Sequence, residues 1–276
     1  MGSTRTNGST GGNGNSVGTN LSYAKFLFVI SRQDDESGWN TLRVAGGHVA
    51  RGFFNDFDLD DSRETPPQAL ETIQFFIRSG EPSATGGPCI ERARHLVHVS
   101  SRYRPRLEQV GEELRRRLGD AADVITLDGA LRRSRYSSAE MHSYEVQQAP
   151  PRRSGRLSRH AIILPIRKSS AWWRQSPLER HAYFYPHVDP SSGSAAKGHA
   201  LAAECGIASL FRRVYHNPDG YERPNEYDFV TYFECDDMGL PVFDNVVASL
   251  RDVEQNPEWR YVEEGPTWRG RRVLRW

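Results

Sequence analysis

The chain has 276 residues and a formal net charge of +1, from 36 lysines and arginines against 35 aspartates and glutamates. A charge so near zero gives no electrostatic case for nucleic acid or an acidic membrane as the main partner. No apolar run approaches the roughly 18–20 residues that span a bilayer, so no membrane association is expected. Aromatic residues make up 11% of the chain, which argues against global disorder, and the length fits one large domain or two ordinary ones.

The three cysteines, Cys89, Cys205 and Cys235, are far apart and form no C-x-x-C pair. This pattern suits neither a disulfide framework nor a zinc site and fits a reducing compartment, so we predict a cytoplasmic protein. A periplasmic location is the alternative if a signal peptide has been removed. Residues 1–20 consist of Gly, Ser, Thr and Asn with little else, and they are predicted to be a disordered tail.

The N-terminal half, residues 21–150, begins with a predicted strand. Lys25–Ser31 (KFLFVIS) is short, aromatic and β-branched, which is typical of a buried strand, and His95–Ser100 (HLVHVS) has the same character. Between them lies a polar stretch with Gly46 and Gly47, in which no element is predicted.

Two helices are predicted in the same half. Pro66–Ser79 has apolar residues at helical spacing, namely Ala69, Ile73, Phe76 and Ile77. Pro105–Gly119 has Pro at its start and Gly at its end, and its apolar stripe consists of Leu107, Val110, Leu114 and Leu118. Residues 145–160 are polar and basic, and they are the best candidate for a linker between the two halves.

The C-terminal half, residues 151–276, shows a clearer pattern. Its predicted strands are Ala161–Arg167, Ser209–Tyr215, Asp228–Glu234 and Trp268–Leu274. Ser176-Pro-Leu-Glu179 is a capping box that predicts a helix over 177–187, and Val242–Gln255 is predicted as a second helix with Phe243, Val246, Val247, Leu250 and Val253 inward. This β-α-β-β-α-β order is the split unit of ferredoxin-like folds. The fold class predicted for the whole chain is α+β, with two such units in tandem.

General chemical motifs are missing from the sequence. It contains no phosphate-binding loop, dinucleotide fingerprint, H-E-x-x-H or G-x-S-x-G. The region that begins at Lys168 is unusual, because Trp172-Trp173 follows it and His187 lies at the end of the next predicted helix. Spacing alone allows a structural interpretation, with both tryptophans in the core and the histidine as a helix cap that favours the dipole.

Five motifs occur in a fixed order over this half. They are Lys168-x-x-x-Trp172-Trp173, Ser176-Pro-x-x-Arg180, His187, Arg212-Arg-Val-Tyr-His216 and Asp228-Phe-Val-Thr-Tyr-Phe-Glu234. Together they closely resemble the haem domain of the chlorite dismutase family, over about residues 162–272 and more weakly in the N-terminal half. The resemblance implies two ferredoxin-like units of dimeric α+β barrel type, haem b and its iron in the C-terminal unit, and a homopentamer for a chain of this length.

The resemblance also implies roles for individual residues. His187 corresponds to the proximal histidine that binds the haem iron, and Arg212 to the distal arginine that holds an oxyanion substrate. Lys168, Trp172 and Trp173 fall where the family lines the haem edge and propionates. Tyr136 corresponds by approximate position alone to a hydrogen-bond donor to a propionate, and core packing is an equal alternative for it.

Two departures from the family pattern stand out. Gln255 falls where chlorite-degrading members have a glutamate that accepts a hydrogen bond from the proximal histidine. An amide oxygen still orients the ring but lacks the carboxylate's charge. The segment Val188–Ala208 is enlarged, and we expect a solvent-exposed loop there, with an approach of His199 to the distal side as the alternative.

The leading functional hypothesis is the haem-dependent decomposition of chlorite to chloride and dioxygen, with Arg212 as the catalytic residue. Gln255 and the enlarged segment suggest a second hypothesis, a diverged haem enzyme that acts on another oxidant or substrate. A non-catalytic haem-binding protein is a third. A ferredoxin-like RNA-binding module is disfavoured because acidic residues, Asp228 and Glu234, flank the aromatic strand.

Overall fold

A computed structural model describes residues 22–32, 36–53, 71–82, 89–131, 143–144, 148–151, 158–274 and 276. The predicted disordered tail over 1–20, Tyr136 and part of the predicted linker over 145–160 lie outside these ranges. Within them, no helix is both long and apolar enough to cross a membrane.

The N-terminal half consists of four antiparallel strands and two long helices. In chain order its elements are β1 (Ser22–Ser31), α1 (Glu36–Val49), β2 (Thr72–Arg78), η1 (Ile90–Arg92), β3 (His95–Ser101), α2 (Arg104–Leu118), η2 (Gly119–Ala121) and β4 (Ala122–Leu131). The strands lie side by side in the order β2-β3-β1-β4.

The C-terminal half repeats this arrangement with more short helices. Its first elements are β5 (His160–Lys168), α4 (Ser170–Arg174), α5 (Pro177–Ala182), β6 (His187–Val188), β7 (Ala195–Ala196), α6 (Gly198–Ala202) and η5 (Glu204–Gly206). The remaining elements are β8 (Phe211–His216), β9 (Phe229–Cys235), α7 (Gly239–Arg251), η6 (Pro257–Tyr261), β10 (Val262–Glu264) and β11 (Trp268–Val273). Its main strands lie in the order β11-β5-β9-β8.

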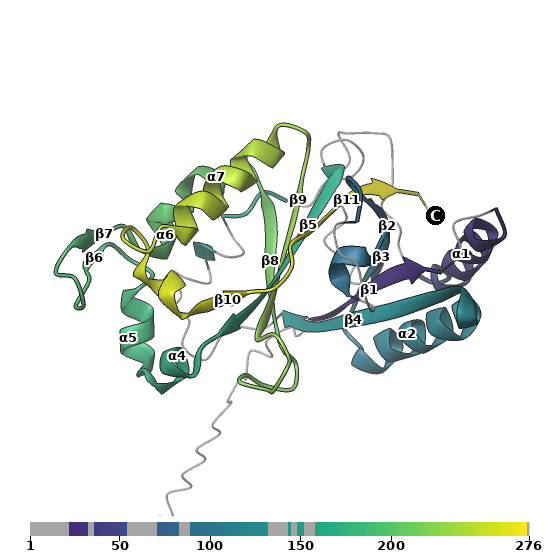
Figure 1. The fold of residues 1–276 in the computed structure, drawn as a ribbon, viewed down its shortest axis with the longest axis horizontal. Helices are drawn as coiled ribbons and strands as arrows, with labels where there is room; N and C mark the ends of the chain where they lie inside the picture. Colours follow the sequence, from purple (N-terminus) through teal and green to yellow (C-terminus); the bar gives the residue numbers. More distant parts are fainter. Residues whose placement is uncertain are drawn as a thin grey trace, which may run out of the picture.

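The two sets of strands form one sheet that closes on itself. Its order is β10-β5-β11-β2-β3-β1-β4-β8-β9, and β5 also pairs with β9. The N-terminal helices α1 and α2 lie beside their own strands, and α4 to α7 lie on the opposite side of the molecule beside β5, β8 and β9 (Figure 1). The chain is therefore an α+β protein in which helices cover the outside of a closed antiparallel sheet.

The closed sheet explains why Lys25–Ser31 is apolar at nearly every position. Successive side chains of a strand point to opposite faces. Phe26 and Phe28 join the cluster inside the sheet, with Trp268 and Tyr232, whereas Leu27 and Val29 join the cluster beneath α1 and α2. A third cluster lies between the C-terminal strands and helices α6 and α7.

Most predicted strands and the helix over 105–119 are confirmed, but the helix predicted over Pro66–Ser79 is wrong. Its described part forms strand β2 (Thr72–Arg78), which lies between β3 and β11. Both faces of this strand are covered, so Ile73, Phe75 and Phe76 are all buried and the period of two is lost. The glycine-containing stretch in which no element was predicted forms α1, where Gly46 lets the helix pack closely: a Cβ there would lie 3.2 Å from Phe75.

Two predicted helices end early. The capping box at Ser176 and Glu179 is present, but α5 ends at Ala182, shortly before Pro186, which removes a backbone donor and disfavours helix in the residue ahead of it. Helix α7 ends at Arg251, so Gln255 lies in the following turn and Val253 is 39% exposed, not inward as predicted.

Candidate functional site

A pocket that is partly open to solvent lies on the outer face of the C-terminal strands. Alternate residues of three strands point into it, as the period of two requires. They are Leu164, Ile166 and Lys168 of β5, Arg212, Val214 and His216 of β8, and Phe229, Thr231 and Phe233 of β9. Helix α7 adds Val246, Val247 and Leu250, and the short helices add Trp172, His199, Glu258 and Trp259. The pocket is thus mostly apolar, with a few ionisable groups, which is typical of a cofactor site.

Three of these ionisable groups form a connected set. The Nζ of Lys168 donates to Oε1 of Glu258 at 2.5 Å, and Nδ1 of His199 lies 3.1 Å from Oε2 of the same carboxylate. The side chains of Lys168 and Glu258 are only 7% and 14% exposed, so the pair is shielded from water. The Nζ of Lys168 also lies 4.2 Å from the ring centroid of Trp172.

The charges in this set stabilise one another. Burial disfavours the charged carboxylate of Glu258, but Lys168 and His199 outweigh this cost and hold its pKa well below its usual range. Burial lowers the pKa of Lys168, and the nearby carboxylate opposes that shift. The carboxylate is therefore ionised, and it fixes the imidazole of His199 with Nδ1 as the donor.

One nitrogen of His199 and one of Trp172 form no hydrogen bond within the part of the chain that the structure describes. The only ring nitrogen of His199 that hydrogen-bonds within the described residues is Nδ1, so Nε2 remains for a ligand. The indole Nε1 of Trp172 is buried and has no hydrogen-bond partner in the same described ranges. Buried donors are rarely left unsatisfied, so Nε1 of Trp172 indicates a ligand that accepts a hydrogen bond there. Because Nδ1 of His199 is the donor, its Nε2 carries a lone pair that can bind a metal.

Arg212, on β8, lies at the pocket wall and is 8% exposed. Its Nη1 donates to the carbonyl of Ile207 at 2.9 Å, and its Nη2 donates to the carbonyl of Tyr144. The guanidinium carbon lies 4.8 Å from the Tyr144 ring centroid, and this ring is also 6.2 Å from the ring of His199. Tyr144 thus contacts both residues.

The structure does not bring His187 to this pocket. It lies on β6, and its Nδ1 is 2.8 Å from the carbonyl of Tyr185. The predicted helix end on which its placement depended is absent, because α5 ends five residues earlier. The enlarged segment, predicted to be a solvent-exposed loop, instead contains β6, β7, α6 and η5, and it carries His199 into the pocket.

Gln255 is also outside the pocket, although it was predicted to stand where the family has its glutamate. The carboxylate that bonds the pocket histidine comes from Glu258, three residues further along the chain. Trp173 does not line the pocket either: its Nε1 lies 3.3 Å from Oδ2 of Asp228, and its ring stacks on Tyr221. Of the other predicted site residues in the described ranges, Lys168, Trp172 and Arg212 line the pocket, and Tyr136 lies outside those ranges.

The sequence carries a partial signal for His199 but none for Glu258. Pro186 stands directly before His187 and marks the end of a helix, and Gly198 stands directly before His199 and marks the start of another segment. The contact between His199 and Glu258 depends on the packing of α6 against η6, and no local sequence pattern predicts that packing.

Comparison with known proteins gives a consistent answer. No protein-family model matches the chain. A chlorite dismutase of Ideonella dechloratans is 26% identical over 103 residues, which make up 37% of this chain and 30% of the relative. Chlorite dismutase from Candidatus Nitrospira defluvii superposes with a TM-score of 0.61 in its complex with imidazole, at 19% identity over 93% of this chain and 92% of the other. A double mutant of that enzyme gives a TM-score of 0.62 at 19% identity, over 92% of each chain.

These similarities define the fold as that of chlorite dismutases. The chain is chlorite dismutase-like, and the resemblance predicted from its motifs is confirmed. The sequence match spans less than a third of the curated relative's length.

Proposed function

We propose that the chain is a haem b-binding oxidoreductase that decomposes chlorite to chloride and dioxygen. The observation that carries the proposal is the connected set of His199, Glu258 and Lys168 in a pocket that also contains Arg212. A histidine held at Nδ1 by a carboxylate presents Nε2 to a metal, and an arginine in the same pocket supplies a cation for an anionic substrate.

The residues of the pocket fit a haem. His199 replaces His187 as the proposed iron ligand, and Glu258 replaces Gln255 as the group that orients the imidazole and raises its basicity. Trp172 offers its unpaired Nε1 to a propionate, and the apolar residues of β9 and α7 pack against the macrocycle. When bound, haem supplies the redox centre at which chlorite reacts. The Tyr144 ring contacts both His199 and Arg212, so it would have to move or pack against a haem bound in this pocket.

Arg212 is proposed to bind the chlorite anion and to hold the chlorine-containing product until the oxygen–oxygen bond forms. Its guanidinium already bonds two backbone carbonyls, so the anion must exchange with one of them. A negatively charged oxygen is a stronger acceptor than a neutral carbonyl, and this favours the exchange.

The strand orders support a finer description of the fold as two ferredoxin-like units over residues 21–150 and 151–276. Each half has the order β-α-β-β-α-β in its main elements, and each places its first and third main strands at the centre of its four. We further propose that the chain assembles as a homopentamer, as the resemblance implies.

The test is haem reconstitution of matched histidine variants. We expect the purified chain to bind about one haem with a Soret band, His199→Ala to lose the iron–histidine signature, and His187→Ala to keep it. On an oxygen electrode, the haem-loaded chain should release dioxygen from chlorite, and Arg212→Ala should retain haem but lose at least about tenfold in rate.

Each part of the proposal can fail separately. An absence of haem binding would contradict the whole proposal. Haem binding without dioxygen release would contradict the activity and leave a non-catalytic haem protein. Loss of the iron–histidine signature in His187→Ala but not in His199→Ala would return the ligand role to the residue predicted from sequence.

A further inference from the structure

Strands β6 and β7 pair as a hairpin, which comes directly before α6 and is anchored by a buried carboxylate. Asp189 follows β6, and its side chain is 2% exposed. Its oxygens accept hydrogen bonds from the backbone N–H and hydroxyl of Ser191 and from the hydroxyl of Ser192. Burial disfavours the ionised form, but bonds from Arg260 and these serines outweigh it and keep the pKa of Asp189 well below its usual range.

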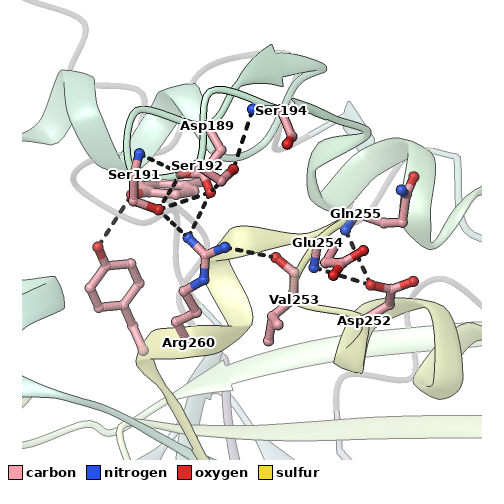
Figure 2. A network of polar contacts seen from close by, with 11 residues as sticks. Asp189, Ser191, Ser192, Ser194, Asp252, Val253, Glu254, Gln255 and Arg260 are labelled. Carbon is pink, nitrogen blue, oxygen red and sulfur yellow. Dashed lines mark hydrogen bonds and ion pairs between the residues drawn. The ribbon is translucent and has the colours of Figure 1, made fainter.

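Arg260 joins this hairpin to the segment after α7. Its Nη1 donates to Oδ2 of Asp189 at 2.7 Å and to Oγ of Ser191 at 2.6 Å, and its Nη2 donates to the carbonyl of Val253 at 3.4 Å. Figure 2 shows the guanidinium between the hairpin and the turn that contains Val253 and Gln255. One side chain thus holds two segments that are far apart in sequence.

The same two segments carry the proposed iron ligand and its carboxylate. His199 lies just beyond the hairpin, and Glu258 is two residues before Arg260 on the single short helix η6. Backbone bonds tie the segments together next to the ligand, because the N–H groups of Lys197 and Gly198 both donate to the carbonyl of Gln255. Any shift of the hairpin relative to η6 therefore changes the contact between His199 and Glu258.

We propose that the Asp189–Arg260 pair is a positioning device that sets the hydrogen bond from Nδ1 of His199 to Glu258. The inference rests on the proposed function, in which His199 binds the haem iron through Nε2. The orientation and basicity of an axial histidine depend on the partner of its other nitrogen. The pair thereby tunes the iron from outside the pocket, since neither residue lines it.

The test measures the iron–histidine bond directly. In Asp189→Asn and Arg260→Gln, we expect the iron–histidine stretch in the resonance Raman spectrum of the ferrous haem protein to move to lower frequency. Haem transfer to apomyoglobin should be about 3–10-fold faster, less than the 10–100-fold typical of a direct partner of the ligand. Asp244→Asn is the matched control, because it breaks an exposed ion pair between α7 and Arg269 of β11 and should change neither value.

Further variants separate positioning from general damage. Arg260→Lys keeps the charge and should restore most of the stretch frequency, and circular dichroism of the apo forms should match the wild type. An unchanged frequency and release rate in Asp189→Asn and Arg260→Gln would overturn the inference while haem binding stands. Failure of the wild-type chain to bind haem would instead overturn the proposed function, and the inference with it. Haem binding through another residue would overturn the ligand role of His199 and the inference, and would leave the proposed function standing.

Discussion

At the scale of single residues, Glu258 of the pocket should also contribute to the stability of the fold. Glu258→Gln leaves the buried ammonium of Lys168 without its charge partner, and we expect the free energy of unfolding of the apo chain to fall by about 3 kcal/mol. Urea denaturation measures this. Glu263→Gln is the control, since Glu263 is 63% exposed in its pair with Arg167 and its loss should be within error. Equal losses in both variants would contradict the argument.

The stability that Glu258 provides should depend on pH. Its pKa is lowered in the folded chain, so the contribution is present above the unfolded value of 4.5 and is lost as the pH falls below it. The gap in unfolding free energy between the wild type and Glu258→Gln should therefore narrow when urea denaturation is repeated from pH about 5 down to about 3. A gap that is constant over this range would show that folding does not lower the pKa of Glu258.

The cysteines should differ strongly in reactivity. Burial raises the pKa of Cys235 to about 12, whereas Cys205 is exposed. The thiolate is the reactive form, so iodoacetamide at neutral pH should label Cys205 in the native chain and reach Cys235 only after denaturation. Mass spectrometry of the tryptic peptides reports both. Equally fast labelling of both residues would contradict the burial of Cys235.

At the scale of the elements, the start of α6 depends on Gly198. Its φ is +70°, and a Cβ there would lie 2.2 Å from the carbonyl oxygen of Tyr185. Gly198→Ala combines backbone strain with this clash, and it should destabilise the chain by more than about 2 kcal/mol in urea denaturation and weaken haem binding. Gly193→Ala has a similar φ of +71° with no atom within 4 Å, so it isolates the backbone cost at about 1 kcal/mol. Equal losses of unfolding free energy in the two variants would show that the clash with Tyr185 contributes nothing.

The elements also show what the sequence allows one to predict. Helix α2 has a strict apolar stripe and recognisable ends, and β1 has a short aromatic run, so local pattern suffices for both. Strand β2 was mistaken for a helix because Ile73, Phe76 and Ile77 happen to fit helical spacing, and only its position between two other strands explains the burial of Phe75.

For the candidate site, residues on or beside the strands could be predicted from the sequence, and residues on the short helices could not. Lys168, Trp172 and Arg212 could be placed because each lies on or directly beside a well-predicted strand. His199 and Glu258 could not, because they lie on short helices of five residues each, whose positions depend on packing and not on period. The prediction for His187 assumed a helix that extends past Pro186, and the structure ends that helix at Ala182.

At the scale of the whole molecule, the two halves share one sheet. Strand β11 pairs with β2 of the N-terminal half and with β5 of its own half, and β4 meets β8 at the other seam. The ion pair between Arg272 and Glu234, with side chains 1% and 0% exposed, adds a buried link from β11 to β9.

We therefore expect the halves to unfold together. Tryptophan fluorescence and far-ultraviolet circular dichroism should give coincident transitions in urea, although the chain is longer than most two-state domains. Two separate transitions would show that each half is stable without the shared strands.

The place of β11 in the closed sheet has a consequence for synthesis. On the ribosome, β2 and β5 are made long before residues 262–273. One edge of β2 is covered only by β11, and one edge of β5 is covered only by β10 and β11. Unpaired edges of apolar strands are the places where nascent chains join one another. The period between the emergence of β5 and that of β11 is therefore the time at which this chain is most exposed to aggregation, and the time at which a chaperone would protect it most.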